Sequence, residues 1–386
     1  MKVKTITCHN VYNYGATLQA YALQRYLSEL GHDVQIIDYR PVYLRLRYNF
    51  WLINENSPYK SICDEYPFLH LMYALLHYRN RFVTGGRKTA FDRFNLEFLK
   101  LSSNTYGSYF EICNNLPDAD IYIAGSDQIW NSKMPNGKDA AFYLSFVPPG
   151  KIRASYAASF GTDSILEENK QFVAKMIKSF DYVSVREKTG LKILESLGIT
   201  SGVNVVDPVL LLSRNIWESL ISRKYNEKYV LVYDFIEDPM IKESALKISK
   251  QFGYKIYSIN DYTKQSYADK NISNAGPIEF LELIYSAQVI VSNSFHATVF
   301  SVIFEKSFYV YDLQKLSNFT RTQDFLSGIG LSEQRINKSD QINLAHVIDY
   351  TTVLTSLSKH QKRSVDFLKM ILKDDCKTSE HLKLNH

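Results

Sequence analysis

The chain alternates short apolar runs with amphipathic stretches, and this pattern predicts strands followed by helices. Residues 3–8 form the first apolar run, and residues 16–30 carry apolar side chains at helical spacing as far as Gly31. Glycine is typical just after a helix, because it adopts the left-handed backbone readily. Residues 34–38 form the next apolar run. This strand, loop, helix and strand predict the start of a parallel, doubly wound sheet.

The alternation stops after this unit and resumes about eighty residues later. Residues 41–95 are basic, aromatic and poorly periodic, so we expect them to form a partly helical insertion. Beyond it the pattern predicts strands at 120–124, 153–160, 182–185, 203–206, 229–234, 255–259, 288–291 and 308–311. It predicts helices at 167–179, 187–197, 278–286 and 297–304, one ending at residue 252 and a long one at 341–372.

Two successive sets of strands and helices indicate an α/β protein with two Rossmann-like domains facing across a cleft. We expect an N-terminal domain at 1–215 that carries the insertion, and a C-terminal domain at 216–375 that ends in the long helix. A frayed tail follows at 376–386. Ligands of such sheets bind at the carboxyl ends of the strands, which the cleft brings face to face.

Composition and charge narrow the class of protein. Hydrophobic residues make up 45% of the chain and charged residues 22%, as in ordinary globular proteins. Residues 40–93 hold nine Lys and Arg against four Asp and Glu, an excess equal to the formal net charge of +5. This basic stretch fits first a solvated face, second an anionic lipid surface and only distantly a nucleic acid. Without a secretory leader or an apolar stretch of membrane-spanning length, we expect a cytoplasmic protein.

Polar residues cluster just after the first predicted strand. Asn13, Tyr14 and Gly15 stand where the first helix begins. Gly15 would let the backbone approach a ligand, and the helix N-terminus would attract an anion. The alternative is a tight turn that binds nothing.

A second polar cluster follows the strand at 120–124. Within it Asp127 can act as a general base or bind sugar hydroxyls, and Trp130 can stack on a sugar. Ser126, Gln128 and Asn131 add further polar groups. The alternative is an aspartate that caps a helix beside a core tryptophan.

Two candidate residues suit an anionic ligand. Arg186 follows a predicted strand, and its guanidinium suits a carboxylate or a phosphate, or else a salt bridge with Glu187 or another acid. His296 opens an apolar helix within the polar segment 292–298, where it can exchange a proton or donate to an anion. A lone histidine is usually structural, but the polar residues around this one favour a function.

Several enzyme classes lose support because their motifs are missing from the sequence. There is no Gly-x-Gly-x-x-Gly after the first strand, no Gly-Lys-Ser/Thr loop, no Gly-x-Ser-x-Gly and no His-Glu-x-x-His. The four cysteines lie far apart and have no metal-ligand spacing. We therefore expect no metal and no bound cofactor.

Taken together, these segments resemble the polysaccharide pyruvyltransferase family. The resemblance covers roughly residues 1–330, and its parts are fairly specific only in their combined order and spacing. The matching segments are 13–16 (Asn-Tyr-Gly-Ala), 19–23, 125–131 (Gly-Ser-Asp-Gln-Ile-Trp-Asn), 156–161, 184–187 (Ser-Val-Arg-Glu), 207–208 (Asp-Pro) and 294–297 (Ser-Phe-His-Ala).

The resemblance implies the architecture of B-type glycosyltransferases, with phosphoenolpyruvate as the donor on the second domain. The acceptor would be a pair of sugar hydroxyls, which would become a cyclic pyruvate ketal. The family associates the positions of Arg186 and His296 with the donor, and we add Ser294, Phe295, Ala297, Thr298 and Arg321 to the donor side. On the acceptor side we place Asn13, Tyr14, Gly15, Gln19, Ser126, Gln128, Trp130 and Asn131.

One position departs from the family pattern. Many members carry arginine two residues before the histidine, where this chain has Ser294, so one donor contact is missing or comes from Arg321 or Arg153. Our hypothesis is that His296 protonates the donor or assists phosphate departure, while Asp127 takes a proton from the acceptor.

Two alternatives to this function remain. The chain could be a glycosyltransferase that uses a nucleotide sugar, which the serine at position 294 would permit, or a non-catalytic member of a glycan-assembly complex. A lipid-linked acceptor at the inner membrane face would give the basic insertion a role. The acceptor sugar and the oligomeric state stay open.

Overall fold

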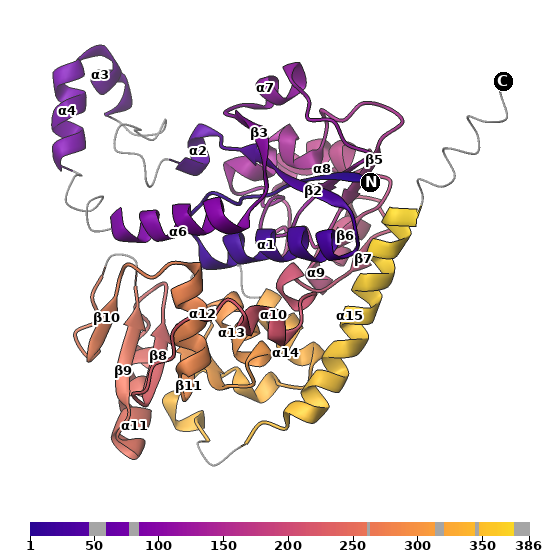
Figure 1. Ribbon diagram of the computed structural model, residues 1–386. Helices are drawn as coiled ribbons and strands as arrows, with labels where there is room; N and C mark the ends of the chain where they lie inside the picture. Colours follow the sequence, from indigo (N-terminus) through magenta and orange to yellow (C-terminus); the bar gives the residue numbers. More distant parts are fainter. Residues whose placement is uncertain (46–58, 77–84, 261–262, 313–319, 344–346, 374–386) are drawn as a thin grey trace.

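The computed structural model describes residues 1–45, 59–76, 85–260, 263–312, 320–343 and 347–373. Its centre is a pair of five-stranded parallel sheets, one in each half of the chain (Figure 1). The N-terminal sheet contains β1 (Lys2–Ile6), β2 (Asp33–Tyr39), β3 (Leu101–Tyr106), β4 (Ile121–Ala124) and β5 (Ile152–Ser155). The C-terminal sheet contains β8 (Tyr229–Tyr233), β9 (Lys255–Ile259), β10 (Lys270–Ile272), β11 (Val289–Ser292) and β12 (Ser307–Val310).

Both sheets have the same topology. The strand orders are β3-β2-β1-β4-β5 and β10-β9-β8-β11-β12, and every pair is parallel. The winding reverses between β1 and β4 in one sheet and between β8 and β11 in the other. Such a reversal opens a crevice at the carboxyl ends of the strands. The structure thus confirms two Rossmann-like domains facing across a cleft.

The central strands follow directly from the sequence pattern, whereas two of the edge strands, β3 and β10, do not. All five residues of β8 and all four of β4 and β11 are buried, as a sheet covered by helices on both faces requires. The sequence patterns of β3 (LSSNTY) and β10 (KNI) are polar, because an edge strand can face solvent. Periodicity alone therefore missed these two edge strands, one in each sheet.

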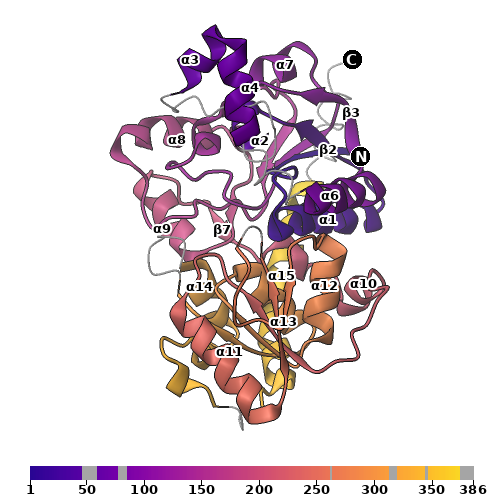
Figure 2. The same ribbon diagram turned by 90° about the vertical axis from the view of Figure 1, so that its left-hand side faces the viewer.

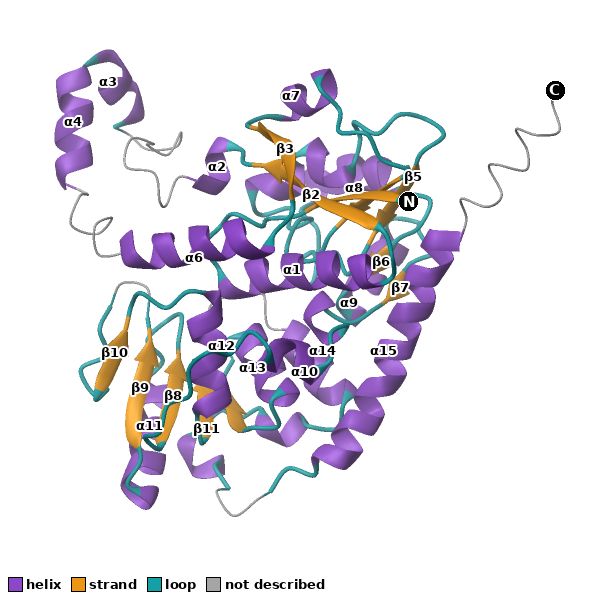
Figure 3. Cartoon of the chain, in the orientation of Figure 1, coloured by secondary structure: helices purple, strands orange, loops and turns teal. Residues whose placement is uncertain are grey.

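Helices connect the strands and cover the sheets (Figure 3). In the N-terminal half they are α1 (Tyr14–Glu29), α7 (Tyr109–Asn114), α8 (Lys170–Ile177), α9 (Lys188–Ser196) and α10 (Arg214–Glu218). In the C-terminal half they are α11 (Pro239–Phe252), α12 (Pro277–Ser286), α13 (Phe295–Ile303), α14 (Thr320–Gly328) and α15 (Tyr350–Lys373). Two short parallel strands, β6 (Ser184–Val185) and β7 (Val203–Asn204), continue the N-terminal half beyond β5.

The insertion predicted at 41–95 is helical where the structure describes it. It contains α2 (Val42–Arg45), α3 (Lys60–Glu65), α4 (Pro67–Leu76) and most of α6 (Gly85–Phe98), while residues 46–58 and 77–84 lie outside the described part (Figure 2). The predicted end at residue 95 is wrong, because α6 continues to Phe98. Phe91 and Phe94 of α6 belong to an apolar core that also contains Phe280 of α12. The last helix of the insertion is therefore part of the contact between the two halves.

A buried aromatic contact holds the two halves together. The ring of Tyr14 on α1 stacks on Phe280 of α12, with centroids 4.3 Å apart and 7° between the planes. The Tyr14 hydroxyl donates to the carbonyl of Ala275 at 2.9 Å and accepts from Nη1 of Arg87 at 2.5 Å. Because this contact lies beside the start of α1, it fixes how the carboxyl ends of the two sheets face each other.

The long C-terminal helix ties the halves together a second time. It begins at Tyr350 rather than at the predicted residue 341, and its end returns to the N-terminal half (Figure 1). There Phe367 and Leu368 pack in one core cluster with Val3 and Leu23. The helix is therefore shared between the halves. The tail predicted at 376–386 lies outside the described residues.

We expect Phe367→Ala to lower the free energy of unfolding by about 3–5 kcal/mol, because it leaves a cavity where α15 packs on the first sheet. Met370→Ala, at a position of the same helix that is 46% exposed, should change it by less than about 1 kcal/mol. Urea unfolding of both variants checks this. Equal losses would mean that the end of α15 does not pack on the N-terminal half.

Candidate active site

A cleft of about 580 Å³ lies between the two halves, at the carboxyl ends of the central strands. Its volume is in the usual range for sites that bind small molecules. Side chains after β1 and β4 line one wall, and side chains after β8, β9 and β11 line the other. The lining residues used below are Tyr12, Asn13, Asp127, Gln128, Asn136, Asp234, Glu237, Asn260, Ser294, Phe295, His296 and Arg321.

Three lining residues have an unusual backbone conformation. Tyr12, Asp127 and Glu237 have φ values of 48°, 75° and 56°, in the left-handed region that residues other than glycine seldom adopt. The backbone at Asp127 is held in place, because its carbonyl accepts the N–H of Ser159 at 3.0 Å. Strain of this kind tends to gather at functional sites, where it aims a side chain.

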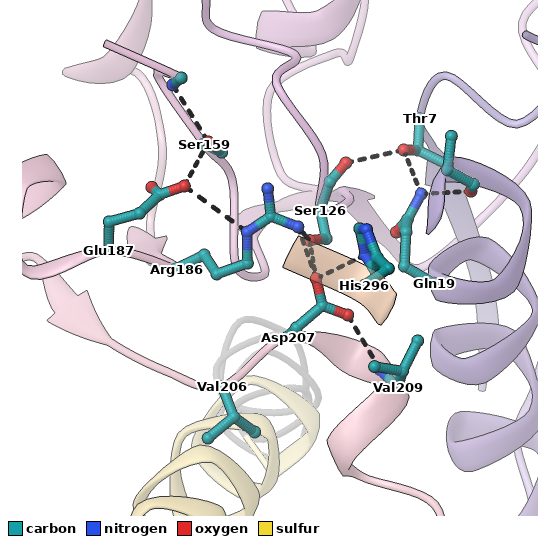
Figure 4. A network of polar contacts seen from close by, with 12 residues as sticks. Thr7, Gln19, Ser126, Ser159, Arg186, Glu187, Val206, Asp207, Val209 and His296 are labelled. Atoms are coloured by element: carbon teal, nitrogen blue, oxygen red, sulfur yellow. Dashed lines mark hydrogen bonds and ion pairs between the residues drawn. The ribbon is translucent and has the colours of Figure 1, made fainter. Parts of the chain in front are cut away.

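A buried carboxylate links the two halves next to the cleft (Figure 4). Asp207 follows β7, and its Oδ2 accepts from Nη1 of Arg186 at 2.5 Å and lies 3.3 Å from Nε2 of His296. Its Oδ1 accepts the N–H of Val209 at 3.1 Å. Burial alone would raise the pKa of Asp207, but the charges of His296 and Arg186 outweigh burial and hold that pKa well below its ordinary value. Asp207 is therefore a fixed negative charge between an arginine of one half and a histidine of the other.

Arg186 is only partly satisfied by its neighbours. Its Nε lies 3.5 Å from Oε1 of Glu187, and Glu187 in turn accepts from the hydroxyl of Ser159 at 2.5 Å. The salt-bridge alternative for Arg186 is thus realised. Nη2 is buried without a hydrogen-bond partner among the described residues. Arg186 lines a smaller cavity of about 50 Å³ rather than the main cleft, and this cavity shares Phe295 and Arg321 with the cleft.

Arg321 on α14 is the more available cation. It lines both cavities, and its buried Nε has no hydrogen-bond partner among the described residues. Its guanidinium lies over the ring of Phe295 at 5.7 Å, and that of Arg186 lies over the same ring at 5.0 Å. Burial, followed by repulsion from Arg186, lowers the pKa of Arg321 to about 10. Arg321 stays protonated at neutral pH, and an incoming anion would stabilise it.

His296 is clamped between the two halves. On one side its Nε2 faces Asp207, and on the other side α1 passes so close that only glycine fits at position 15. A Cβ added to Gly15 would lie 1.9 Å from Nδ1 of His296. Gly15 therefore makes room for the imidazole, and the predicted approach of a ligand to Gly15 itself is wrong.

Of the residues predicted on the donor side, some line the cleft and others do not. Phe295, His296, Ser294 and Arg321 line the cleft. Ser294 is the N-cap of α13, and its hydroxyl accepts the N–H of Ala297 at 3.4 Å. Ala297 and Thr298, also placed on the donor side, are buried in that helix and do not line the cleft. Arg153 lines neither cavity and donates to the carbonyl of Val147, so it does not replace the missing family arginine.

The residues predicted on the acceptor side separate in the same way. Asn13 and Gln128 line the cleft. Asn131 is buried and donates to the side chain of Gln128 at 2.9 Å, so it positions that residue. Ser126 is also buried, and its hydroxyl accepts from Nη1 of Arg186 at 3.2 Å. Ser126 therefore belongs to the Asp207 network instead of the cleft wall.

Three acceptor-side predictions are contradicted by burial. Trp130 is fully buried, its ring is parallel to that of Tyr143 with centroids 5.8 Å apart, and its Nε1 donates to a backbone carbonyl, so it cannot stack on a sugar here. Gln19 is fully buried and donates to Thr7 Oγ1 at 2.9 Å. Tyr14 is the interdomain contact described above. All three positions need large or polar side chains for packing, which a sequence pattern cannot distinguish from binding.

Sequence reasoning missed several residues of the site. Asp207 was noted only as part of an Asp-Pro pair, and Asn136, Asp234 and Asn260 were not singled out. Asp234 and Asn260 directly follow the buried strands β8 and β9, and Asp207 comes soon after β7. A systematic search for polar residues after buried strands would have found these three. Within the described residues, no group of three or more His, Cys, Asp or Glu side chains could hold a metal ion.

The fold and the site define a two-domain α/β protein whose interdomain cleft is lined by His296 and Arg321 and lies beside the buried ion pair of Arg186 and Asp207. The chain belongs to the polysaccharide pyruvyl transferase family, because the model of that family matches residues 13–314. A search of curated proteins found no match. Among the described residues, no helix is both long enough and apolar enough to cross a membrane.

Solved structures with a similar fold have low sequence identity. UDP-GlcNAc 2-epimerase of Methanocaldococcus jannaschii, in complex with UDP-GlcNAc and UDP, is 14% identical, with 96% of this chain and 100% of that chain covered and a TM-score of 0.46. The S. aureus MnaA–UDP structure is 12% identical, with 96% of each chain covered and a TM-score of 0.49. E. coli heptosyltransferase WaaC with ADP is 7% identical, with 93% and 100% covered and a TM-score of 0.42.

We expect Asp207→Asn to destabilise the protein at neutral pH by about 3–5 kcal/mol, because it leaves the buried guanidinium of Arg186 without its counter-charge. The folded-state pKa of Asp207 lies below its ordinary value of 3.8. Its contribution is therefore complete above about pH 4 and declines as the pH falls further. Urea unfolding between neutral pH and about pH 2 should show the gap between variant and native chain shrinking below pH 4.

A matched control is Asp366→Asn on α15, which removes an exposed carboxylate that pairs with Lys362 at 2.7 Å. This variant should track the native chain across the whole pH range. A gap for Asp207→Asn that is absent at neutral pH, or constant below about pH 4, would contradict the assignment of the lowered pKa.

Proposed function

We propose that this protein transfers the pyruvyl group of phosphoenolpyruvate to two hydroxyls of a sugar and so forms a pyruvate ketal. The observation that carries the proposal is the pair of guanidiniums over the Phe295 ring, beside His296. One of them, Arg321, lacks an anionic partner among the described residues. Membership in the polysaccharide pyruvyl transferase family supports this donor and a glycan acceptor.

The arrangement suits a small, multiply charged anion. Phosphoenolpyruvate carries a carboxylate and a phosphate, and guanidiniums bind both groups in bidentate fashion. Arg321 offers its donors to the cleft, and Nη2 of Arg186 is unpartnered beside the smaller cavity. The first residues of α13 add backbone N–H groups that have no partner within the helix. Arg321 thereby takes the place of the family arginine that Ser294 replaces.

The proposed reaction uses one acid and one base. His296 gives a proton to the methylene carbon of phosphoenolpyruvate, and the first sugar hydroxyl adds to the neighbouring carbon while Asp127 takes its proton. The bond from that carbon to the phosphate oxygen breaks and phosphate leaves. The second hydroxyl then adds and closes the ketal. One hydroxyl proton replaces the proton that His296 gave, and the other leaves with the phosphate.

Asp207 holds the acid in position in this scheme. Its carboxylate accepts from Arg186 and faces Nε2 of His296, so it couples a donor-binding group to the catalytic imidazole. Gly15 restricts the ring from the opposite side. A histidine fixed from two sides loses little freedom when the donor binds. Asn13 and Gln128, on the opposite wall from Arg321, would bind the acceptor sugar.

We expect phosphoenolpyruvate to raise the thermal midpoint of the native chain and to have no effect on Arg321→Ala. Saturation at a hundred times the dissociation constant stabilises a protein by about 2.7 kcal/mol, which is readily measured. Without ligand, Arg321→Ala should be at least as stable as the native chain, because it removes a poorly compensated cation. Arg25→Ala, which removes only an exposed pair with Glu29, should keep the full shift.

The same thermal-shift assay with a panel of nucleotide sugars tests the alternative function, a nucleotide-sugar-dependent glycosyltransferase. A midpoint shift with a nucleotide sugar and none with phosphoenolpyruvate would replace this proposal with a glycosyltransferase. An unchanged phosphoenolpyruvate shift in Arg321→Ala would remove Arg321 from the donor site.

A second prediction separates binding from chemistry. Asp127→Asn should keep the phosphoenolpyruvate shift but lose turnover by about 10²–10⁴-fold, the usual contribution of a general base. Asparagine tolerates the left-handed backbone at this position, so the fold should survive. Phosphate release with a panel of oligosaccharide acceptors measures turnover, and Asp163→Asn, an exposed acid, is the control. Turnover near the native level in Asp127→Asn would show that another group takes the proton.

A further inference from the structure

In the helical pair α3–α4, small side chains are buried and large apolar side chains are exposed to solvent, the opposite of what packing in water favours. Cys63 and Ala74, which are small, are 5% and 0% exposed. Phe68, Leu75 and Leu76, which are large and apolar, are 70%, 57% and 77% exposed. A hairpin made for water would bury the large apolar residues and expose polar ones. We call the exposed set the hairpin surface: Ile62, Tyr66, Phe68, Leu69, Leu71, Met72, Leu75 and Leu76.

The hairpin surface stands apart from the rest of the molecule. In Figures 1 and 2 the pair α3–α4 projects from the periphery of the N-terminal half. None of its residues lines the cleft or the smaller cavity. Scattered apolar side chains are ordinary on a surface. Seven gathered on two adjacent helices, with Tyr66 at their junction, mark a surface that another apolar medium covers.

The charged residues near the hairpin in the sequence indicate what kind of partner covers the hairpin surface. The ten residues of α4, PFLHLMYALL, include no Lys, Arg, Asp or Glu. In the sequence, residues 40–93 hold nine Lys and Arg against four Asp and Glu; three of these acids, Glu55, Asp64 and Glu65, precede α4, and residues 66–91 carry three arginines, one lysine and no acid. An uncharged apolar helix within a basic insertion matches the lipid interface, where acyl chains take the apolar side chains and anionic headgroups attract the cations.

We propose that α3–α4 binds the surface of an anionic lipid bilayer, with α4 lying in the interface. A helix of ten residues is only about 15 Å long and cannot span the hydrocarbon core, so α4 rests on one leaflet. Tyr66 is 53% exposed at the junction of the two helices, where an aromatic ring suits the headgroup boundary. This inference does not depend on the proposed donor, and it would bring the active site to glycans carried on lipids.

The test is co-sedimentation of the full chain with vesicles of phosphatidylcholine alone, or of phosphatidylcholine mixed with phosphatidylglycerol. We expect binding to the mixed vesicles that weakens as salt is added. The double variant Phe68→Ser, Leu76→Ser should bind at least tenfold more weakly, since each residue would lose its burial in the acyl region. The matched control is Leu96→Ser, Phe110→Ser, which removes two side chains that are 86% and 71% exposed outside the hairpin.

The following outcomes would contradict membrane binding by the hairpin. The native chain could fail to bind either vesicle, or the hairpin variant could bind as well as the native chain. Loss of binding in the control pair as well would show that apolar exposure in general, and not the hairpin, drives association. Size-exclusion chromatography that shows a native dimer becoming monomeric in the hairpin variant, with vesicle binding unchanged, would assign the hairpin surface to a second copy of the chain.

Discussion

The site depends on one buried carboxylate that the two halves of the protein share. Asp207 comes from the N-terminal half and is fully enclosed, yet it faces one partner from each half, Arg186 and His296. A buried carboxylate is costly unless it is paired and hydrogen-bonded, so its presence ties the two halves to one relative position. If the domains separated, Asp207 would lose one partner and His296 would lose the group that orients it. The geometry of the site is therefore a property of the closed arrangement.

Apolar packing between the halves makes this electrostatic contact possible. The stacking of Tyr14 on Phe280 brings the start of α1 against α13, and Gly15 lets the two backbones approach until the imidazole of His296 fills the gap. A buried ion pair contributes little net stability by itself, because desolvation offsets the attraction. The aromatic contact supplies the stabilisation, and Asp207 and its partners supply the specificity. In this chain Tyr14 and Gly15 are thus explained by domain contact, whereas the neighbouring Asn13 lines the cleft.

The sequence could predict what depends on local apolar patterns, but it could not predict contacts between residues that lie far apart in the chain. The fold followed from periodicity, because the central strands are buried on both faces and read as continuous apolar runs. The edge strands β3 and β10 were not predicted, because their residues are polar and do not form an apolar run. Of the residues that the sequence singled out, Asp127, His296, Ser294 and Arg321 line the cleft, and their roles there stay predictions. The sequence placed Trp130, Gln19 and Tyr14 there wrongly, since a buried tryptophan or tyrosine has the same letter whether it packs on protein or on a sugar. The role of Asp207 depends on partners 21 and 89 residues away in the chain, which no local pattern reveals.

The two arginines over Phe295 illustrate how the protein divides positive charge between structure and binding. Arg186 is compensated by Asp207 and Glu187 and keeps one edge of its fork unpartnered. Arg321 makes no hydrogen bond or ion pair with an acid in the described part of the chain, and burial and Arg186 lower its pKa to about 10 although Glu187, Asp127 and Asp207 partly oppose them. A cation that only stabilised the fold would be expected to have an acid beside it, as Arg186 does. Arg321 instead opens onto the cleft, where an anion that arrives with the substrate can complete the pair. In the proposed site, an anion bound at Arg321 would supply the ion pair that the unliganded protein lacks, and the electrostatic cost of the buried cation would then favour binding.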